Sequence, residues 1–320
     1  MTATNATKTI DFGPAWSASL RRGPEAELRG WVDAALTWCV ETDAIAMKHF
    51  RKAAAERKPD RTFVTIADTS IEERLRSRIS AAFPKHGIVG EEFGDRAPKD
   101  KAGTRWYVDP IDGTHNYLRG VPIFGTLLAV ERDGELQAAV ISAPALRTRW
   151  GAWRGGGAWA FSTIGGAEPR RIAVSRIDDL AESHVLYTSY AEMAASGRVP
   201  GLHALLARAW RERGFGDFWS YTLVAEGAAE AMVETDLKPW DAAAPFLLVE
   251  EAGGRATDLT GERTIHGGTF IATNGLLHDR VLSILAGRGE AAREAAPPPD
   301  AAPPPDAAPS DATPPKEVDR

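Results

Sequence analysis

The segment from Trp106 to Thr114 constrains the chain more than any other, because an apolar run there ends in two closely spaced carboxylates. Its first residues have the composition of a buried strand, and that strand would deliver Asp109 and Asp112 to its end. Pro110 stiffens the turn between them, so the two side chains can converge on one point. The segment therefore predicts a strand that leads directly into a cluster of negative charge.

The residues that follow this strand predict an anion site beside the carboxylates. Gly113 lets the backbone approach a ligand closely, because glycine has no side chain in the way. The amides of Gly113 and Thr114 would form a phosphate seat where a helix begins, since the first N–H groups of a helix have no partner within it. We therefore expect a cation site and an anion site side by side.

Two further acids stand in similar positions elsewhere in the chain. A short apolar strand ends in Gly90 and presents Glu91, and Asp241 stands at the expected start of a helix. If these two acids share one site with Asp109 and Asp112, like-charge repulsion and desolvation make the empty cluster unfavourable, and divalent cations would relieve both costs. Oxygen ligands without clustered cysteine or histidine select hard ions, Mg²⁺ before Mn²⁺ or Ca²⁺.

Each of these acids also has a simpler interpretation. Asp241 could be only a helix N-cap, Asp68 could only precede a helix that Thr69 starts, and Asp112 followed by glycine is a common turn. The joint occurrence of the acids, rather than any one of them, favours a metal site. The seven histidines are scattered without ligand spacing, and only His115 is of interest, because it follows the expected phosphate loop directly.

Charge and cysteine content exclude several classes of protein. The chain has 320 residues, of which 43% are hydrophobic and 26% charged, as in a folded enzyme. A net charge of −6 argues against sequence-independent binding to nucleic acid, which needs a basic surface. Cys39 is the only cysteine, which excludes an intrachain disulfide and a multi-cysteine zinc site. Met1 to Ile10 is polar, and no apolar run approaches the ~20 residues of a membrane span, so we expect a cytoplasmic protein without a membrane anchor.

The sequence predicts two subdomains between two tails. We expect residues 1–14 to be a flexible N-terminus, and residues 289–320 contain a Pro-Pro-Pro-Asp-Ala-Ala unit twice in succession. Such a composition buries too little apolar surface to offset the entropy of ordering, so we expect a disordered tail, with a proline-rich interaction ligand as the alternative. A glycine-rich stretch near residue 165 divides the remainder into an N-terminal subdomain (15–165) and a C-terminal one (166–288).

Hydrophobic periodicity predicts the elements of these subdomains. Apolar residues at three- and four-residue spacing, from Leu28 to Phe50, indicate a long helix that includes Cys39 and Met47 and ends near residues 58–60. A second helix should start near Thr69, with Glu72 completing a capping box. Strands follow at 106–108, 123–130 and 136–141, the last two forming a hairpin around Asp133-Gly134. Helix-like stretches (202–210, 221–233, 242–251) then alternate with strand-like ones (184–187, 270–272), which indicates a layered α/β arrangement.

These motifs together resemble the inositol-monophosphatase-like, lithium-sensitive phosphatases over roughly residues 25–288. The resemblance is carried by Gly90-Glu91-Glu92, by Asp109-Pro110-Ile111-Asp112-Gly113-Thr114 with Asn116, and by Trp240-Asp241-Ala242-Ala243 through Glu250-Glu251-Ala252-Gly253-Gly254. It implies a five-layered αβαβα sandwich that is often dimeric. It also implies that Glu91, Asp109 and the Ile111 carbonyl hold one Mg²⁺, that Asp109, Asp112 and Asp241 hold a second, and that a third, weaker ion binds near Glu91.

The same resemblance assigns the remaining catalytic roles. Thr65-Ile66-Ala67-Asp68 matches the family's threonine-x-x-aspartate segment, which pairs Asp68 with Thr114. That pair, with Glu91 and the first metal, would orient and activate a water molecule for in-line attack on phosphorus.

The substrate is predicted from a narrower resemblance. The stretches Ser142 to Leu146 with Arg149-Trp150, and Gly216 to Tyr221 with Leu223 to Gly227, are similar to the histidinol-phosphate phosphatase branch of the family. Glu234 matches a position that contacts the part of the substrate without phosphate, and Asp217 and His115 are further candidates. A carboxylate suits the ammonium group of histidinol phosphate, but it also suits inositol hydroxyls.

The first hypothesis is therefore hydrolysis of histidinol phosphate, a small phosphorylated metabolite, in histidine biosynthesis. Inositol monophosphate and a nucleotide-derived phosphate are alternatives in the same class of enzyme. A non-catalytic regulatory or scaffold protein, which would bind partners through its proline-rich tail, is the alternative from another class.

Overall fold

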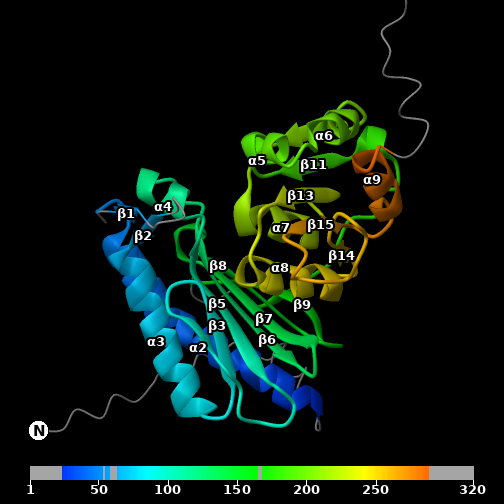
Figure 1. Cartoon of the computed structure of the whole chain (residues 1–320). Coiled ribbons are helices and arrows are strands. Elements are labelled where there is room, and N and C mark those ends of the chain that lie inside the picture. Colours follow the sequence, from blue (N-terminus) through cyan, green and yellow to red (C-terminus); the bar gives the residue numbers. More distant parts are fainter. Residues whose placement is uncertain (1–23, 53–54, 58–62, 165–167, 288–320) are drawn as a thin grey trace, which may run out of the picture.

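A computed structural model describes residues 24–52, 55–57, 63–164 and 168–287 of the chain. Two sheets are stacked with helices between them and on both outer faces (Figure 1). Both predicted tails lie outside the described residues. Across the described residues, no helix combines the length and apolarity that a bilayer crossing requires.

The first part of the fold is an eight-stranded sheet covered on one face by two long helices. Its strands are ordered β10-β9-β8-β7-β6-β5-β3-β4, and β5 is parallel to β3 but antiparallel to β6. The helices are α2 (Pro24–His49) and α3 (Ile66–Ala82), and the strands are β3 (Gly87–Gly90), β4 (Gly94–Arg96), β5 (Arg105–Asp112), β6 (Gly125–Arg132), β7 (Glu135–Ala143), β8 (Thr148–Trp153), β9 (Gly157–Ser162) and β10 (Arg170–Ile172). A separate pair, β1 (Ala55–Arg57) and β2 (Phe63–Thr65), leads into α3; the short α4 (Thr114–Arg119) follows β5, and the 3-10 turn η1 (Pro144–Leu146) follows β7.

The second part is a five-stranded sheet with the order β12-β11-β13-β15-β14. Its strands are β11 (His184–Tyr187), β12 (Arg211–Arg213), β13 (Ala231–Thr235), β14 (Arg255–Thr257) and β15 (Thr269–Thr273). The connecting helices are η2 (Leu180–Glu182), α5 (Tyr190–Ala195), α6 (Val199–Leu206), α7 (Asp217–Ala225), α8 (Pro239–Glu251) and α9 (His278–Leu285). Strand β11 is parallel to β12 and β13, whereas β15 is antiparallel to both of its neighbours.

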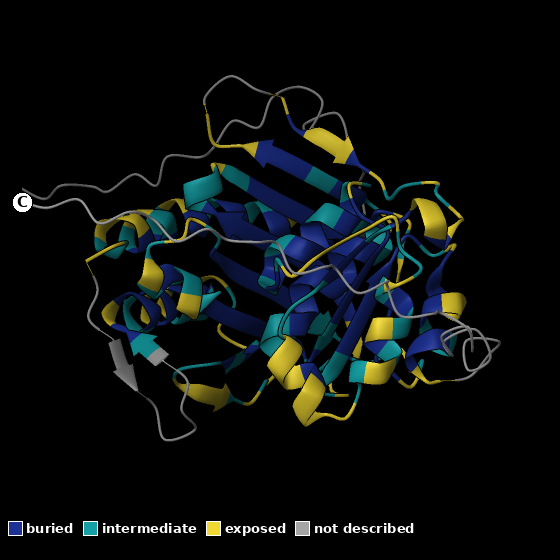
Figure 2. Cartoon of the chain, turned by 90° about the horizontal axis from the view of Figure 1, so that it is seen from above, coloured by how far each residue is buried: buried dark blue, intermediate teal, exposed yellow. Residues whose placement is uncertain are grey.

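Three hydrophobic cores hold these layers together, as the alternation of side chains along the strands requires. Val108 of β5 points toward α2 and α3, whereas its neighbour Tyr107 points toward the middle helices α7 and α8. A third core lies between the second sheet and helices α6 and α9. Figure 2 shows that buried residues are concentrated in the sheets and in the helices between them. The order helix, sheet, helix, sheet, helix confirms the predicted αβαβα sandwich.

Several predicted elements are confirmed. Strands β6 and β7 form the expected hairpin, and both turn residues, Asp133 (φ 53°) and Gly134 (φ 77°), are left-handed, as in the tight turns that join twisted strands. The stretches expected as strands at 184–187 and 270–272 are β11 and β15. The helix expected at 242–251 is α8, and the one expected at 202–210 is α6, which begins earlier, at Val199, and already ends at Leu206.

The long helix α2 ends earlier than expected, at His49. Arg51 is left-handed (φ 64°), a conformation that a helix cannot continue through, and residues 58–60 lie outside the described part of the chain. Cys39 is fully buried, as predicted, whereas Met47 is 43% exposed and does not belong to the apolar face.

Helix α3 begins at Ile66, before the expected start near Thr69. The capping box is formed one turn earlier: the Thr65 hydroxyl accepts from the Ala67 amide at 3.1 Å, and Asp68 accepts from the Thr65 amide at 2.8 Å. Glu72 is therefore not a capping residue.

The stretch 221–233, expected to be helical throughout, is a helix followed by a strand. Helix α7 ends at Ala225, and Gly227 (φ 74°) turns the chain into β13. Residues 231–233 are completely buried between their neighbouring strands, so packing in the sheet decides their conformation. The subdomain boundary near residue 165 stays a prediction; β10, which follows it, pairs with β9 of the first sheet.

Candidate active site

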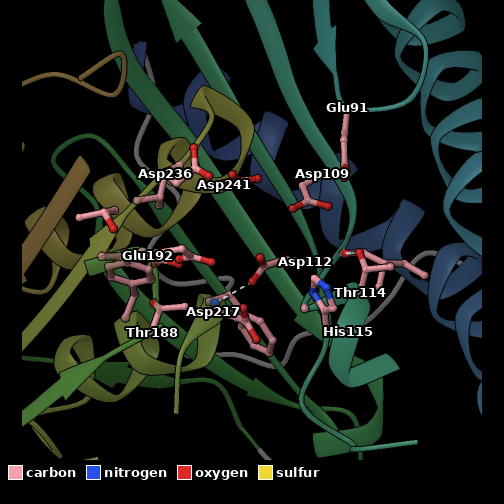
Figure 3. Close-up of a pocket in the computed structure, with 17 residues that line it drawn as sticks. Glu91, Asp109, Asp112, Thr114, His115, Thr188, Glu192, Asp217, Asp236 and Asp241 are labelled. Carbon is pink, nitrogen blue, oxygen red and sulfur yellow. Dashed lines mark hydrogen bonds between the residues drawn. The ribbon is translucent and has the colours of Figure 1, made fainter. Parts of the chain in front are cut away.

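A cavity of about 230 Å³ contains nearly all of the predicted site residues. It is lined by side chains from both parts of the fold, and Figure 3 shows Asp109, Asp112 and Asp241 pointing into the same space. Eight carboxylates line it: Glu91, Asp109, Asp112, Glu192, Asp217, Glu234, Asp236 and Asp241. Among the described residues that line this cavity there is no lysine or arginine, and His115 is the only side chain that can carry a positive charge.

The first three acids reach the cavity because their strands end at one edge of the first sheet. Strands β3 and β5 are parallel, so Glu91, directly after β3, and Asp109 and Asp112, near the end of β5, lie at the same edge. The pairing of β5 with β6 shifts register between Asp109 and Asp112. This irregularity lets both carboxylates line the cavity although they are three residues apart in a strand.

Asp109 is the most deeply buried of these acids, with 2% of its surface exposed. Burial raises its pKa well above the usual range, and the negative charges of Glu91, Asp112 and Asp241 raise it further. Its Oδ1 atom accepts no hydrogen bond from the residues that the structure describes. A buried carboxylate oxygen without a donor is unfavourable, and a bound cation would satisfy it.

Asp112 is held by the second part of the fold. Its Oδ2 atom accepts a hydrogen bond of 2.6 Å from the Phe218 amide, in the first turn of α7. Burial raises the pKa of Asp112 well above its usual range, and the nearby acids Asp217 and Asp241 add to the effect, whereas the Phe218 amide opposes it. The contact joins the end of β5 to the start of α7.

Asp241 both supports the start of a helix and lines the cavity. Its Oδ2 atom accepts from the Lys238 amide at 2.8 Å. Lys238 is the N-cap of α8, so Asp241 supports the helix start from the third helical position and is not the N-cap that the simpler interpretation made it. Burial raises its pKa to about 6, while hydrogen bonds with the Lys238 amide and with Asp109 lower it. The contact with Asp109 brings acids from distant parts of the sequence together, as the motifs predicted.

The expected phosphate loop has the predicted backbone geometry. Gly113 is left-handed (φ 79°), and a Cβ atom there would lie 3.0 Å from the Ile123 carbonyl oxygen and 3.2 Å from Asp217 Oδ2, so the turn requires glycine. Helix α4 begins at the next residue, Thr114, whose hydroxyl donates to the Ile111 carbonyl at 3.0 Å. The Ile111 carbonyl is therefore already used as an acceptor at the edge of the cavity.

Asp68 lies behind the cavity rather than in its lining. It is completely buried in the first turn of α3, and its Oδ2 atom accepts from both the amide and the hydroxyl of Thr65, at 2.8 and 2.5 Å. Its charge still acts on the site, because it contributes to the raised pKa of Asp109. The pairing of Asp68 with Thr114 stays a prediction.

The candidates for substrate recognition lie on the C-terminal side of the cavity. Glu234 on β13 accepts a hydrogen bond from the Tyr221 hydroxyl, and burial raises its pKa to about 8. Asp217 is left-handed (φ 50°) and accepts from Asn116 Nδ2 at 2.8 Å, a bond that ties α7 to α4. Burial and the charge of Glu192 raise the pKa of Asp217 to about 6.

Sequence reasoning missed several residues of the lining. Thr188, Glu192 and Asp236 stand in loops or short helices without any local pattern, so no signal marked them. Tyr221 could have been found, because it stands in the stretch that resembles the histidinol-phosphate phosphatase branch. These residues extend the acidic lining beyond the predicted metal ligands.

The acids line one cavity, but they are not drawn tightly together. Among the described residues, no three histidine, cysteine or acidic side chains form a group compact enough to hold a metal ion. The donors themselves fit a hard divalent cation, because they are all oxygen atoms and Asp109 Oδ1 still lacks a partner among the described residues.

Comparison with known proteins agrees with this fold. A histidinol-phosphatase of Mycobacterium tuberculosis is 44% identical over 230 residues, covering 72% of this chain and 87% of that protein. A histidinol-phosphatase of Streptomyces coelicolor is 41% identical over 252 residues, covering 76% and 92%. The crystal structure of the extragenic suppressor protein suhB from Bartonella henselae is similar with a TM-score of 0.72 and 26% identity, covering 80% of this chain and 98% of that one. Residues 27–290 match the inositol monophosphatase family, and the chain therefore belongs to this family of phosphatases.

Proposed function

We propose that this phosphatase hydrolyses histidinol phosphate with the help of Mg²⁺. The observation that carries the proposal is the lining of the cavity, which has eight carboxylates and, among the described residues, no lysine or arginine. A phosphate monoester cannot enter such a lining unless cations lie between the carboxylates and the phosphate. Mg²⁺ suits this role because it prefers oxygen ligands and commonly binds substrate phosphates as well.

The residues that would hold the ions are those of the first-sheet edge and the start of α8. Glu91, Asp109 and the Ile111 carbonyl would hold one ion, and Asp109, Asp112 and Asp241 a second. A third ion would bind more weakly near Glu91. Bound Mg²⁺ would lower the pKa of a water molecule and offset the charge of the phosphoryl group.

The chain itself would position the two reacting partners. The amides of Gly113 and Thr114 would donate hydrogen bonds to phosphate oxygens, as the glycine-dependent turn before α4 allows. Glu91 would accept a hydrogen bond from the attacking water, and the Asp68–Thr114 pair would orient it for in-line attack. Water would thus attack phosphorus as the bond to the leaving oxygen breaks, without a covalent phosphoenzyme.

The choice of histidinol phosphate is supported by the acids that are not needed as metal ligands. Glu234 and Asp217, from the second part of the fold, line the cavity, and so does His115 of α4. An ammonium or imidazole group would find a favourable negative potential there. Both relatives described above, at 41% and 44% identity, are histidinol-phosphatases, which supports the same substrate for this chain.

Phosphate release from a small panel of substrates tests this proposal. With Mg²⁺ present, kcat/KM should be highest for histidinol phosphate. A preference of roughly tenfold for inositol monophosphate, or for a nucleotide-derived phosphate, would reject it, since that corresponds to ~1.4 kcal/mol in the barrier.

Deletion of residues 289–320 tests the scaffold alternative. Turnover should be unchanged in the shortened chain. Loss of partner binding on deletion, together with no phosphatase activity in the intact chain, would support a scaffold.

The same proposal includes a homodimer in the cytoplasm. Each chain of the dimer would contain two subdomains, residues 15–165 and 166–288. The family often forms dimers, and the single cysteine, fully buried as Cys39, suits a reducing compartment. Light scattering coupled to gel filtration would give the mass directly, and a mass of one chain would refute the dimer.

A further inference from the structure

Glu72 of α3 is a buried carboxylate that neither lines the cavity nor caps its helix. It has no exposed surface. Its Oε2 atom accepts from the Glu92 amide at 2.7 Å, and its Oε1 atom accepts from the Phe93 amide at 3.2 Å. Arg76 Nε, one helical turn away, donates to Oε1 at 2.7 Å. A buried charge is tolerated when hydrogen bonds and a partner charge compensate it, and here two of the donors are backbone groups of one turn.

The turn that Glu72 holds is the one that presents Glu91. Arg76 donates a second hydrogen bond to the Gly94 carbonyl, so one acid and one base of α3 together bind residues 92, 93 and 94. On the other side of Glu91, a Cβ atom at Gly90 would lie only 2.2 Å from Glu72 Oε1. Glu72 therefore contacts the backbone on both sides of Glu91, and the glycine before Glu91 is required because this carboxylate occupies the space of a side chain.

We propose that Glu72 is a positioning residue for Glu91, and through it for the Mg²⁺ that Glu91 would hold. The inference rests on the proposed function, because it gives Glu91 the role of a metal ligand. Glu72 does not line the cavity, so it would touch neither substrate nor metal. Its carboxylate fixes the turn after β3, and the fixed turn points the Glu91 side chain into the cavity, where Figure 3 shows it above Asp109.

The neighbouring residue provides a matched control. Glu73 has the same side chain on the same helix, but it is exposed. Glu72→Gln and Glu73→Gln therefore each remove one negative charge from adjacent positions of α3, but only the first change disturbs the turn. Glu72→Asp, which keeps the charge but retracts the carboxylate by one methylene, is a second variant in case Glu72→Gln folds poorly.

Two measurements without turnover test the proposal: Mg²⁺ affinity by isothermal titration, and hydrogen exchange of the amides of residues 92 and 93. In Glu72→Gln and Glu72→Asp, Mg²⁺ affinity should fall roughly 10- to 100-fold, the usual effect of losing a residue that orients a metal ligand, and both amides should exchange faster. Glu73→Gln should behave as the wild type. Equal Mg²⁺ affinity in the Glu72 and Glu73 variants would overturn the proposal, and so would a loss of affinity with unchanged amide exchange.

The failure of the positioning role can be told apart from failure of the proposed function. If the wild type binds no Mg²⁺, the proposed function fails and the positioning role fails with it. If the wild type binds Mg²⁺ and the Glu72 variants bind it equally well, only the positioning role fails.

Discussion

Gly90→Ala should destabilise the chain severely, although alanine is the smallest possible change. The new Cβ atom would lie 2.2 Å from Glu72 Oε1, 2.7 Å from its Cδ atom and 2.8 Å from Arg76 Nη2. These distances are too short for a non-bonded contact of a carbon atom, so the Glu72 side chain must move. The backbone of Gly90 itself does not require glycine, because its φ angle is not left-handed.

The size of the effect follows from the hydrogen bonds that this movement breaks. The Glu72 carboxylate would leave the amides of Glu92 and Phe93, which it now binds at 2.7 and 3.2 Å. Hydrogen bonds to charged groups contribute ~1.5–3 kcal/mol each, so losing two costs about 3–6 kcal/mol. A loss of this size is a large fraction of the stability of an ordinary domain, about 5–15 kcal/mol.

Urea denaturation gives the free energy of unfolding for this variant, and Gly30→Ala is the matched control. A Cβ atom at Gly30, in helix α2, would meet nothing within 4 Å, so that substitution should stabilise the chain by about 0.5–1 kcal/mol. The double variant Gly90→Ala with Glu72→Ala should lose less than the sum of its single changes, because the clash is gone. If the free energy of unfolding of Gly90→Ala lay within about 1 kcal/mol of the wild-type value, instead of ~3–6 kcal/mol below it, the reasoning would be refuted.

Three further predictions concern the site and the core. Asp112→Asn should keep the fold but lose most activity and most Mg²⁺ affinity; isothermal titration with undiminished affinity would contradict its role as a ligand. Arg149→Met should cost up to ~3–5 kcal/mol in urea denaturation, because it leaves the carboxylate of Asp43, whose side chain is only 13% exposed and now lies 2.5 Å from Arg149 Nη2, without its counter-charge; a loss below ~1 kcal/mol would argue against this. The fully buried ring of His278 is bound between Thr257 and Thr273, and burial lowers its pKa to about 4 from 6.5. Its neutral form therefore contributes stability above pH 6.5 that is lost as the pH falls through 4, at most about 3 kcal/mol, and His278→Gln should lack this part of the pH dependence; equal acid sensitivity of the two proteins would count against it.

The parts of the site that could be predicted from the sequence are those with a local pattern. Asp109 and Asp112 follow an apolar run, and Glu91 follows a shorter one, so strand geometry alone places all three at one edge of the sheet. The role of Asp241 could not be decided from the sequence, because a helix start and a metal site leave the same local signal. In the structure its carboxylate binds the amide of Lys238, the N-cap of α8, and also lines the cavity. Its approach to Asp109 depends on how the two sheets are stacked, which no short segment encodes.

The sequence allows two capping boxes at the start of α3, and the predicted one at Thr69 is wrong, because the box forms at Thr65. Thr65 with Asp68 and Thr69 with Glu72 have the same spacing, so local propensity cannot separate them. Tertiary contacts decide, because β2 runs up to Thr65 and the turn after β3 binds Glu72. For the same reason Glu192 and Asp236 could not be found: they reach the cavity only through the fold of the second sheet.

The acidic lining of the cavity also decides which molecules can compete with a substrate. Sulfate or free phosphate finds no lysine or arginine among the described side chains there, so simple anions should bind well only together with a divalent cation, and chelation should weaken their binding. Protonated amines need no bridging cation, since the carboxylates attract them directly. An inhibitor built on a positively charged scaffold should therefore keep its affinity when magnesium is scarce, whereas one built on a phosphate mimic should lose it.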